Sequence, residues 1–430
     1  MGRWLYTGLL RLLAPWLLLH AALQLLLDRG RGARLAERWG FGASLPPGSL
    51  WLHAVSVGEV QAAAVLVRAL RSTHPDLPLL VTTTTATGAA RVRELFGTTV
   101  RHRYLPLDYP GAVRRFLDRV RPCQWVILET ELWPNLLAAC ATRGIPVRLV
   151  SARLSVRTAG RYRQLRGLFA PLLDQVSVLA QTDEDARRYR ALGVKDTQCE
   201  VGGNLKFDLE FIPAQRAAGH DFRAAWQVSG SRFVWVAGST HEGEEQILLA
   251  AHARLRDSLP GALLVLAPRH PPRFAAAAAN IIDSGLPSAR RSLGDAVTAD
   301  TAVLLVDTLG ELLACYLAAD AAFVGGSLVP VGGHSLLEPA AAGIPLFSGP
   351  QVFNAPEVAA ALQGAGALVE VDDADALVEG LAAVAGDPAL AKARGAAALA
   401  VVARGRGALA RAMTVIGAAL PGHSREQLSD

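Results

Sequence analysis

The stretch Ala321–Pro339, AAFVGGSLVPVGGHSLLEP, passes from a short apolar run into two Gly-Gly pairs and then toward a helix. The run Ala321–Val324 predicts a buried strand, and a helix is expected to begin near His334. Paired glycines let a backbone approach a ligand closely. A strand followed by such a turn and a helix is typical of a parallel α/β sheet, which binds ligands at the carboxyl ends of its strands.

The same alternation of strand-like and helix-like segments fills most of the chain. Apolar runs that predict strands in the first half are Leu50–Val55, Leu79–Thr83, Val100–Leu105, Trp125–Leu128, Val147–Val150 and Val176–Ala180. Those in the second half, besides Ala321–Val324, are Phe233–Ala237, Leu263–Ala267, Val303–Val306, Ile344–Phe347 and Ala367–Val371. Helical spacing follows many of these runs, which indicates parallel sheets flanked by helices.

Two α/β domains, each built on a doubly wound sheet, are therefore expected. The boundaries that we predict are 1–40 for an N-terminal segment, 41–205 for the first domain, 206–221 for a linker and 222–430 for the second domain. The linker is placed where glycines and Pro213 interrupt the alternating pattern. A cleft between two such domains is a natural place for an active site.

The basic charge of the chain is concentrated at its N-terminus. The sequence of 430 residues has a formal net charge of +5. Residues 1–40 contain six arginines against one aspartate and one glutamate, which is a net charge of +4. Because the remainder is close to neutral, it does not fit a protein that coats the phosphates of a nucleic acid, and we expect no such partner.

This N-terminal segment also contains an apolar run, LLAPWLLLHAALQLLL at Leu12–Leu27. Arginines flank the run on both sides, and Trp4, Tyr6 and Trp16 are residue types that favour the membrane interface. The run is shorter than the about 20 apolar residues that a spanning helix needs. We interpret it as a membrane-anchor helix, either interfacial or marginally spanning, with its arginines toward anionic lipids. A core helix of a soluble domain is the alternative.

Cysteines and acidic pairs give no sign of a metal centre. The four cysteines, at 123, 140, 199 and 315, are far apart, as expected for buried thiols in a reducing compartment such as the cytoplasm. The acidic groups Asp183–Asp185 and Asp373–Asp375 fall at expected helix starts, where capping explains them. We predict no metal site.

Acidic side chains follow two strands of the first half. Glu59 comes after a tight turn, whereas Glu129 and Glu131 come directly after Trp125–Leu128. A carboxylate at a strand end is well placed for a general base, but a helix N-terminus favours negative charge there as well. Capping readily explains one of Glu129 and Glu131, and less readily both. The threonines at 82–87 suit either helix capping or an anion or sugar site.

Several basic and polar side chains are further candidates for binding a ligand or stabilising charge. Lysine occurs only three times, and Lys206 is a candidate for stabilising a phosphate or a developing negative charge, with a solvent-facing linker lysine as the alternative. Arg269 lies in a proline-rich turn that suits recognition of phosphate or carboxylate. Glu338 is expected one helical turn after His334, where it could accept both hydroxyls of a ribose. The stretch Gly238–Glu244, which contains Ser239, Thr240 and His241, is a candidate phosphate cradle before a helix, although it lacks the spacing of a P-loop.

Taken together, these motifs resemble the 3-deoxy-D-manno-octulosonic acid (Kdo) transferases of Gram-negative lipopolysaccharide assembly. The similarity covers nearly the whole chain and includes HAVSVGEV, ETELWPN, SARLS, NLKFD, STHEGEE, APRH, DTLGEL and FVGGSLV-x-x-GGH-x-x-LEP. It implies a GT-B glycosyltransferase fold of two Rossmann-like domains, CMP-Kdo as donor and a lipid A precursor as acceptor. It further implies an inverting transfer without metal or cofactor, at the cytoplasmic face of the inner membrane and in contact with its anionic lipids.

The resemblance also assigns roles to residues. Glu59 matches the catalytic base of the family, and Glu129 and Lys206 match positions that stabilise the transition state. Positions that match the CMP-binding elements are Pro268, Arg269, Thr308, Leu309, Gly310, Gly325, Gly326, His334, Ser335, Leu337 and Glu338. Further candidates are Glu131, Ser239, Thr240 and His241. The family often has Asn where this chain has Ser335, which is shorter and can still donate one hydrogen bond.

Two alternatives to Kdo transfer stay open on the sequence. One is another GT-B enzyme of envelope biosynthesis, either a nucleotide-sugar transferase or a sugar-nucleotide epimerase. The other is a non-catalytic, membrane-tethered module that binds a sugar nucleotide. The number of Kdo residues added is not determined by these motifs.

Overall fold

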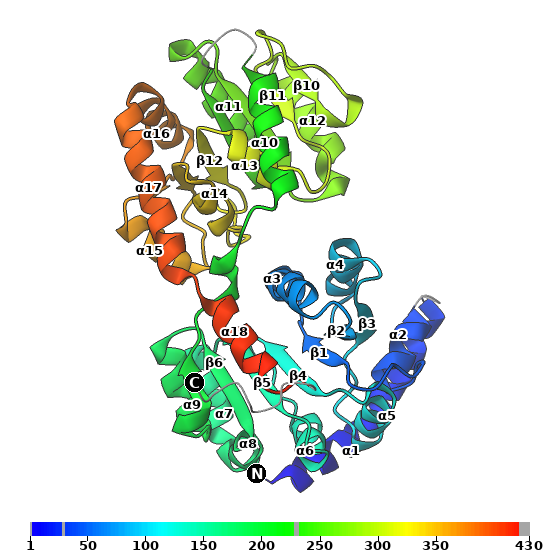
Figure 1. The fold of residues 1–430 in the computed structure, drawn as a ribbon. Coiled ribbons are helices and arrows are strands. Elements are labelled where there is room, and N and C mark those ends of the chain that lie inside the picture. Colours follow the sequence, from blue (N-terminus) through cyan, green and yellow to red (C-terminus); the bar gives the residue numbers. More distant parts are fainter. Residues whose placement is uncertain (1, 28–30, 228–231, 421–430) are drawn as a thin grey trace. The chain divides into compact units, whose positions relative to one another are not determined.

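The computed structural model describes residues 2–27, 31–227 and 232–420, which form two compact units (Figure 1). The first unit contains the chain up to Asp208 together with the residues from Gly405 onward, and the second contains Leu209–Arg404. Each unit is built on one seven-stranded sheet. The expected architecture of two α/β domains is confirmed.

The sheet of the first unit is parallel and has the strand order β3-β2-β1-β4-β5-β6-β7. Its strands are β1 (Leu50–His53), β2 (Leu79–Thr83), β3 (Arg101–Tyr104), β4 (Gln124–Leu128), β5 (Val147–Ala152), β6 (Val176–Ala180) and β7 (Cys199–Val201). Six of the strands follow the order 3-2-1-4-5-6, which is that of doubly wound nucleotide-binding sheets. The order reverses between β1 and β4, so the crevice of this sheet opens there.

Helices cover both faces of this sheet. They are α1 (Arg3–Leu27), α2 (Arg31–Arg38), α3 (Val57–Thr73), α4 (Ala86–Phe96), α5 (Pro110–Val120), α6 (Pro134–Thr142), α7 (Val156–Gln164), α8 (Arg166–Leu173), α9 (Asp183–Leu192) and α18 (Ala408–Gly417), with 3₁₀ turns η1 (Asp196–Gln198) and η2 (Leu205–Asp208). One core contains α5, α6, α8 and α9, and the core on the other face contains α3, α4 and α18. The helices that follow β1 and β4 therefore cover opposite faces.

The second unit repeats the plan with the strand order β10-β11-β9-β8-β12-β13-β14, again with parallel pairs only. Its strands are β8 (Val234–Thr240), β9 (Leu263–Pro268), β10 (Ser288–Arg290), β11 (Val303–Leu305), β12 (Ala321–Val324), β13 (Leu346–Ser348) and β14 (Leu368–Glu370). The order reverses between β8 and β12. The crevice of this sheet is consequently formed by the turns after those two strands.

The helices of the second unit are α10 (Pro213–Trp226), α11 (Glu244–Ser258), α12 (Phe274–Asp283), α13 (Leu312–Ala318), α14 (Leu337–Ala342), α15 (Pro356–Gly364), α16 (Ala374–Gly386) and α17 (Pro388–Gly405), with 3₁₀ turns η3 (Pro271–Arg273) and η4 (Arg291–Leu293). The buried side chains of α11, α12 and α16 share one core. Those of α10 and α13 share the core on the other face.

The stretch expected to be a linker contains the first half of α10. Pro213 is the first residue of this helix, where its missing N–H costs nothing and its φ suits the helix. Gly219 lies where α10 meets α13, and a Cβ added there would lie 2.7 Å from the Cβ of Leu317. The glycine and proline that suggested a linker therefore mark a helix start and a close helix contact.

The C-terminal helix α18 packs on the first unit, although residues 222–430 were expected to form the second domain. Ala412 and Ile416 of α18 are fully buried in the core that α3 and α4 share. Its N-terminus is capped by Asp208, whose carboxylate oxygens accept from the N–H groups of Gly407 at 2.8 Å and Leu409 at 2.9 Å. The first unit is thus built from both ends of the chain.

Among the side chains that the structure describes, three hydrogen bonds attach the N-terminal helix α1 to the rest of the first unit. Tyr6 donates to Asp108 at 3.0 Å, and Thr7 donates to Asn135 at 3.0 Å. The hydroxyl of Tyr109 donates to the carbonyl of Leu10 at 2.7 Å. Among the described residues, no helix combines the length and the apolar character needed to cross a membrane.

The Asp208 cap yields a stability prediction. In Asp208→Ala, two N–H groups at the start of α18 lose their acceptor, so α18 should be destabilised by about 0.5–2 kcal/mol. Hydrogen–deuterium exchange followed by mass spectrometry should show faster exchange in peptides covering residues 405–417. The control is Asp300→Ala, because Asp300 is exposed in a loop of the second unit. Equal exchange of this segment in wild type and Asp208→Ala would contradict the capping role.

Candidate active site

Glu59 lies in the first turn of α3, directly after the crevice strand β1. Its Oε2 accepts from the backbone N–H of Val55 at 2.7 Å, and its Oε1 lies 3.4 Å from the hydroxyl of Ser56. The pKa of this carboxyl is raised to about 7. Burial raises the pKa most, the negative charges of Glu129 and Glu131 add to the increase, and the Val55 hydrogen bond and the charge of Lys206 oppose it. A half-buried carboxyl that holds its proton near neutral pH is a candidate general base.

Glu129, at the end of β4, is held in a strained backbone conformation. Its φ is 57°, in the left-handed region that non-glycine residues rarely adopt. Its Oε1 accepts from Lys206 Nζ at 2.7 Å. Such strain costs about 1–3 kcal/mol and persists where the surroundings impose it, most often at functional sites. The structure thus brings together Glu59, Glu129 and Lys206, which are far apart in the sequence.

Lys206 is rigidly presented by the 3₁₀ turn η2. The N–H of Leu205 donates to the hydroxyl of Ser151 at 2.8 Å, which ties the turn to the end of β5. The side-chain oxygen of Asn204 accepts from the N–H of Lys206 at 3.0 Å. Asn204 and Asp208 of the NLKFD segment thus bond to backbone N–H groups, and Lys206 is its remaining polar side chain. The segment is therefore a support for one ammonium group and not a flexible linker.

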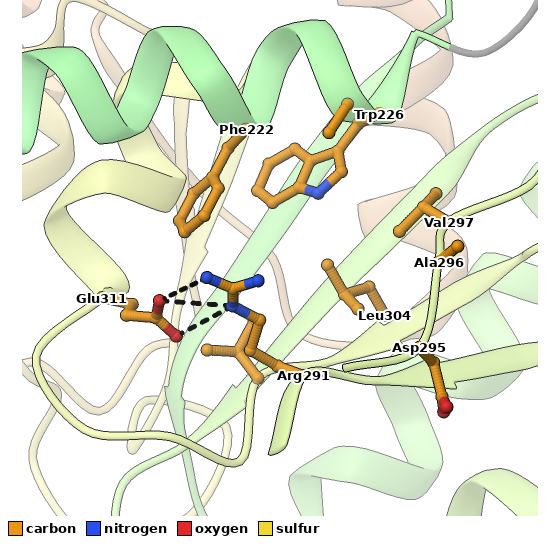
Figure 2. A pocket seen from close by; sticks show the side chains of 10 residues that line it. Phe222, Trp226, Arg291, Asp295, Ala296, Val297, Leu304 and Glu311 are labelled. Atoms are coloured by element: carbon orange, nitrogen blue, oxygen red, sulfur yellow. Dashed lines mark hydrogen bonds and ion pairs between the residues drawn. The ribbon is translucent and has the colours of Figure 1, made fainter. Parts of the chain in front are cut away.

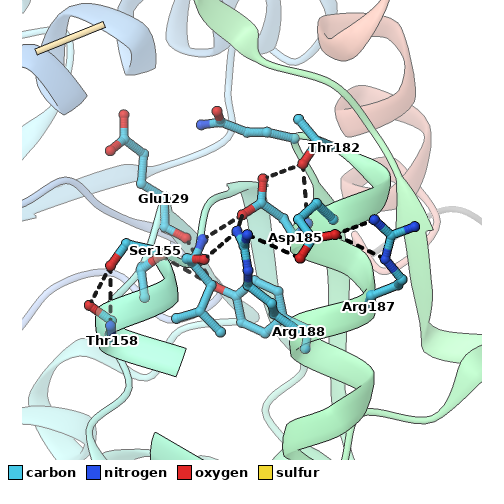
Figure 3. Close-up of polar contacts among 12 residues, drawn as sticks. Glu129, Ser155, Thr158, Thr182, Asp185, Arg187 and Arg188 are labelled. Carbon is cyan, nitrogen blue, oxygen red and sulfur yellow. Dashed lines mark hydrogen bonds and ion pairs between the residues drawn. The ribbon is translucent and has the colours of Figure 1, made fainter. Parts of the chain in front are cut away.

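The loop after β5 is supported by a buried carboxylate (Figure 3). Asp185 of α9 accepts from the N–H of Leu154 at 2.8 Å and from the hydroxyl of Thr182 at 2.7 Å. Arg188 donates to the carbonyl of Leu154 at 2.9 Å. Asp185 and its neighbours in α9 thus have the structural role expected of a helix start, and the side chain of Glu129 points away from them.

Glu131 is oriented by a chain of buried hydrogen bonds. Its Oε2 accepts from Trp133 Nε1 at 2.7 Å and lies 3.0 Å from Nε2 of the fully buried His53. His53 Nδ1 lies 2.9 Å from the hydroxyl of Thr82, which in turn accepts from Trp51 Nε1 at 2.8 Å. His53 Nδ1 also lies 3.1 Å from the carbonyl oxygen of Thr82, so whether Nδ1 donates or accepts depends on the tautomer of the ring. Glu131 is thereby fixed close enough to Glu59 to raise the pKa of that carboxyl.

The threonine-rich stretch is explained by capping and by the core. Thr85 accepts from the N–H of Gly88 at 3.0 Å and so caps α4. Thr82 and Thr83 are fully buried. In the second unit Asp373 caps α16 in the same way, by accepting from the N–H of Ala376 at 2.9 Å. In the part of the chain that the structure describes, no group of three or more His, Cys, Asp or Glu side chains has an arrangement that could hold a metal ion.

In the second unit, the crevice turns are joined by Glu244, a residue that sequence reasoning missed. This carboxylate is fully buried and accepts four backbone N–H groups at 2.7–3.0 Å, from His241, Gly326, Ser327 and Leu328. The amide of Gly326 is thus already bonded within the protein. A Cβ at Gly325 would lie 2.5 Å from the carbonyl oxygen of Ser239, so this glycine allows the turns after β8 and β12 to meet.

Three histidines and one arginine gather beside these turns. His241 and His334 stack with ring centroids 5.0 Å apart and Nε2 atoms 2.7 Å apart, and His270 meets His241 edge-on at 5.4 Å. Burial and the charge of Arg269 lower the pKa of His334 to about 4. Within the described ranges, no acceptor or carboxylate is bonded to the guanidinium of Arg269. A free guanidinium beside neutral imidazoles is a setting that favours an anion.

His334 lies before a helix and not on one. Because α14 begins at Leu337, the expected placement of His334 and Glu338 one turn apart on a helix is wrong. Gly332 and Gly333 have φ values of 102° and 71°, which turn the chain so that the N–H of His334 donates to Gly325 at 3.2 Å. Glu338 lies instead in the first turn of α14, where it contributes to raising the pKa of the buried Tyr316.

The remaining donor candidates lie in turns of the same unit. Thr308 donates to Glu311, and Leu309 is exposed next to Gly310. Pro268 is the last residue of β9 and is buried, as are Thr240 and Leu337. Ser239 has a φ of 59° at the end of β8, and Ser335 is exposed.

Two Rossmann-like units, each with a crevice at the ends of its strands, are the plan of the GT-B fold. A similar solved structure is the UDP-GlcNAc 2-epimerase from Neisseria meningitidis bound to UDP-GlcNAc, with a TM-score of 0.55 and 12% identity over 86% of this chain and 99% of that chain. MurG from Acinetobacter baumannii has a TM-score of 0.54 and 12% identity, again over 86% of this chain and 99% of that chain. At this identity the likeness concerns the fold alone.

Sequence comparison narrows the class to one family. A family model described as 3-Deoxy-D-manno-octulosonic-acid transferase (kdotransferase) matches residues 33–209, and one described as Glycosyl transferases group 1 matches residues 298–400. The 3-deoxy-D-manno-octulosonic acid transferase of Haemophilus influenzae is 38% identical over 97% of this chain and 98% of its own length. That of Bordetella pertussis is 41% identical over 97% and 99%. The chain belongs to the 3-deoxy-D-manno-octulosonic acid transferase family and is a glycosyltransferase.

Because the pKa of Glu59 is raised, replacing Glu59 by glutamine should stabilise the protein relative to wild type by an amount that depends on pH. Between about pH 4.5 and 7, folded Glu59 binds its proton more tightly than the unfolded chain does, so its contribution to stability is present at low pH and lost as pH rises. The Glu59→Gln variant has no carboxyl at this position, so it does not lose stability in this way as the pH rises. The free energy of unfolding of this variant relative to that of wild type should therefore increase between pH 4.5 and 7, toward roughly 3 kcal/mol. Thermal midpoints of both proteins measured across this pH range should show the increase.

The matched control for this measurement is Glu94→Gln, because Glu94 is an exposed carboxylate on α4 that pairs with Arg91 at 2.7 Å. It should show no such increase. A difference between Glu59→Gln and wild type that stays constant from pH 4.5 to 8 would show that the pKa of Glu59 is not raised.

Proposed function

We propose that this chain transfers Kdo from CMP-Kdo to a primary hydroxyl of a lipid A precursor, with Glu59 as the general base. The observation that carries the proposal is the Glu59 carboxyl, whose pKa is raised to about 7 at the crevice of the first sheet. A base is most effective when its pKa lies near the working pH. The names of the relatives, which are Kdo transferases, support the choice of sugar.

In the proposed step, Glu59 takes the proton of the acceptor hydroxyl while that oxygen bonds to the anomeric carbon of Kdo. The bond from this carbon to the phosphate oxygen of CMP breaks, and its electron pair leaves with CMP. Attack from the side opposite the leaving group inverts the configuration at the anomeric carbon. Lys206, fixed by Glu129, places an ammonium near Glu59 and stabilises negative charge in the transition state.

The donor is assigned to the second unit. Arg269 and the His241–His334 pair would meet the phosphate and the sugar carboxylate, since this guanidinium is not used within the described part of the chain. The turn at Thr308–Gly310 and the segment Ser335–Glu338 would hold the nucleoside, with Glu338 on the ribose. Gly325 and Gly326 would shape the crevice, because the amide of Gly326 is bonded to Glu244. In this proposal side-chain cations carry the leaving-group charge, and no metal is required.

We further propose that α1 lies in the interface of the cytoplasmic leaflet of the inner membrane. Five exposed apolar side chains fall within one half of its circumference at 100° per residue, and Trp4 is 91% exposed. They are Trp4, Leu5, Leu9, Leu12 and Leu13. The other half carries Tyr6, Thr7 and Leu10, which attach the helix to the protein. An apolar face flanked by arginines suits a surface of anionic lipid, which is also where the lipid acceptor is found.

Incubation with CMP-Kdo and tetra-acylated lipid A precursor tests the proposed reaction. The product should gain the mass of one or more Kdo units with release of CMP, and Glu59→Gln should slow transfer about 10²–10⁴-fold while CMP still binds. The rate should rise with pH up to about 7, because the base must be deprotonated. Lys206→Met should move this rise to higher pH, since the ammonium lowers the pKa of Glu59.

Glu94→Gln again serves as the matched control and should transfer at the wild-type rate. Wild-type turnover in Glu59→Gln would remove Glu59 from the role of base. Release of UDP from a UDP-sugar, with CMP-Kdo left intact, would instead favour another GT-B enzyme. Tight CMP binding without any transfer would favour a non-catalytic binding module.

Vesicle co-sedimentation tests the interfacial role of α1. The full-length protein should bind vesicles containing phosphatidylglycerol more tightly than vesicles of phosphatidylcholine alone. Because each large apolar side chain contributes about 1.5–3 kcal/mol on burial, the double variant Trp4→Ala/Leu12→Ala should bind at least tenfold more weakly. The control is Ile282→Ala, which removes a side chain that is 74% exposed on α12. Unchanged binding of the double variant would exclude this face from membrane contact.

A further inference from the structure

A second binding site is indicated by a pocket of about 200 Å³ in the second unit (Figure 2). It lies between α10, the loop after η4 and the strand β11. None of the residues that line it is among the candidate donor or catalytic residues described above. The proposed transfer therefore leaves this pocket without a role.

The wall contributed by α10 is aromatic. Phe222 and Trp226 are one helical turn apart, and their rings stack with centroids 5.2 Å apart at an interplanar angle of 19°. Opposite them lie the aliphatic side chains of Val297, Leu304 and Val306. A flat apolar group would contact rings on one side and methyl groups on the other.

The indole nitrogen of Trp226 is a donor that borders this space, and it does not belong to the fully buried polar atoms that lack a partner among the described residues. Trp226 is only 4% exposed, and none of the hydrogen bonds among the described residues uses its Nε1. By contrast, Trp51 and Trp235 donate to Thr82 and His252. The Nε1 of Trp125 also lacks a partner in the described structure, but Trp125 is sealed in the core of the first unit. Figure 2 shows the ring nitrogen of Trp226 turned toward Val297 and Leu304, into the pocket.

A second donor comes from Arg291, below the two rings. Its Nε and Nη2 both donate to the carboxylate of Glu311, at 2.8–3.2 Å, and its guanidinium carbon lies 4.9 Å from the ring centre of Phe222. Within the described residues no bond uses Nη1, which Figure 2 shows on the side away from Glu311. The pocket thus offers two hydrogen-bond donors within an apolar frame.

The charges around the pocket select against an ionised ligand. Glu311 already neutralises Arg291, and the carboxylate of Asp295 stands at the rim. An added carboxylate would meet no unpaired cation there, and it would lose its hydration on entry. A cationic ligand could not form a cation–π contact with this face of the Phe222 ring, because the guanidinium of Arg291 already lies over it. A neutral acceptor, such as a carbonyl oxygen, satisfies the donors without this cost.

We propose that this pocket binds a small neutral planar ligand, namely one aromatic or heteroaromatic ring that carries a carbonyl acceptor. The ring lies against Phe222 and Trp226, and the carbonyl accepts from Trp226 Nε1, with Arg291 Nη1 as a second donor. The volume fits one substituted ring, since an engineered apolar cavity of about 150 Å³ in another protein holds benzene. The inference does not depend on the identity of the donor or acceptor in the transfer reaction.

Benzamide is the probe for this proposal, and the full-length protein is used throughout. In a spectrum of ¹⁵N-labelled indole groups, the Trp226 Nε1–H signal, assigned by its loss in Trp226→Phe, should shift with benzamide to saturation. Ligand-observed NMR should give affinities. Because one hydrogen bond contributes about 0.5–1.5 kcal/mol net, benzamide should bind about two- to tenfold more tightly than toluene, and benzoate should bind more weakly than benzamide.

Trp226→Phe is the matched variant, because it keeps an aromatic ring and removes the donor. It should reduce the affinity for benzamide to that for toluene and leave the affinity for toluene unchanged. Ala296→Phe, which fills the pocket, should abolish binding of both. The proposal is overturned if benzamide causes no saturable shift of the Trp226 signal. It is also overturned if benzoate binds as tightly as benzamide, or if wild type does not distinguish benzamide from toluene.

Discussion

The candidate active site of this protein depends on a geometric constraint of parallel sheets. Where two neighbouring strands send their following helices to opposite faces, the carboxyl ends of those strands are left uncovered. In the first unit this happens between β1 and β4, and the turns after them carry Glu59 and Glu129. In the second unit it happens between β8 and β12, whose turns carry His241 and the glycine pair before His334.

The carboxylates in the two crevices differ in the number of hydrogen bonds that they accept. Glu244 accepts four backbone N–H groups, so both of its carboxylate oxygens are engaged in holding two turns together. Glu59 accepts one short backbone hydrogen bond and faces the like charges of Glu129 and Glu131. A carboxylate that is saturated with hydrogen bonds is a structural element, whereas one that is buried with few of them is available for proton transfer.

The elements that could be predicted from the sequence are those whose pattern is contained in a few consecutive residues. The strands β2, β6 and β12 have the predicted bounds, because each is a run that is buried over nearly its whole length and lies between turn residues. The edge strands β7 and β10 were missed, since each has three residues and includes exposed or charged side chains. The attachment of α18 to the first unit was also missed, because its amphipathic pattern does not reveal which sheet it covers.

The candidate site was predictable to a similar extent. Glu59, Glu129 and Lys206 were found from strand ends and from the rarity of lysine, and the structure brings them together. Glu244 was missed because its partners are backbone amides, which leave no trace in side-chain patterns. The pocket at Trp226 was missed because its walls join α10 to residues 291–311, and a contact between such distant segments leaves no local pattern. Contacts made by backbone atoms or between distant segments thus account for what sequence reasoning did not find.

The place of α18 has a consequence for biosynthesis. The ribosome completes residues 1–208 first, yet the core against α3 and α4 contains Ala412, Ile416 and Leu420 near the other end of the chain. Until those residues emerge, the growing polypeptide carries an uncovered apolar face on its first unit. The second unit, Leu209–Arg404, is one continuous segment, so all of it is synthesised before α18 completes the first unit. The unit whose synthesis begins first is therefore completed last, and a nascent chain that stops before α18 leaves one core of its first unit uncovered.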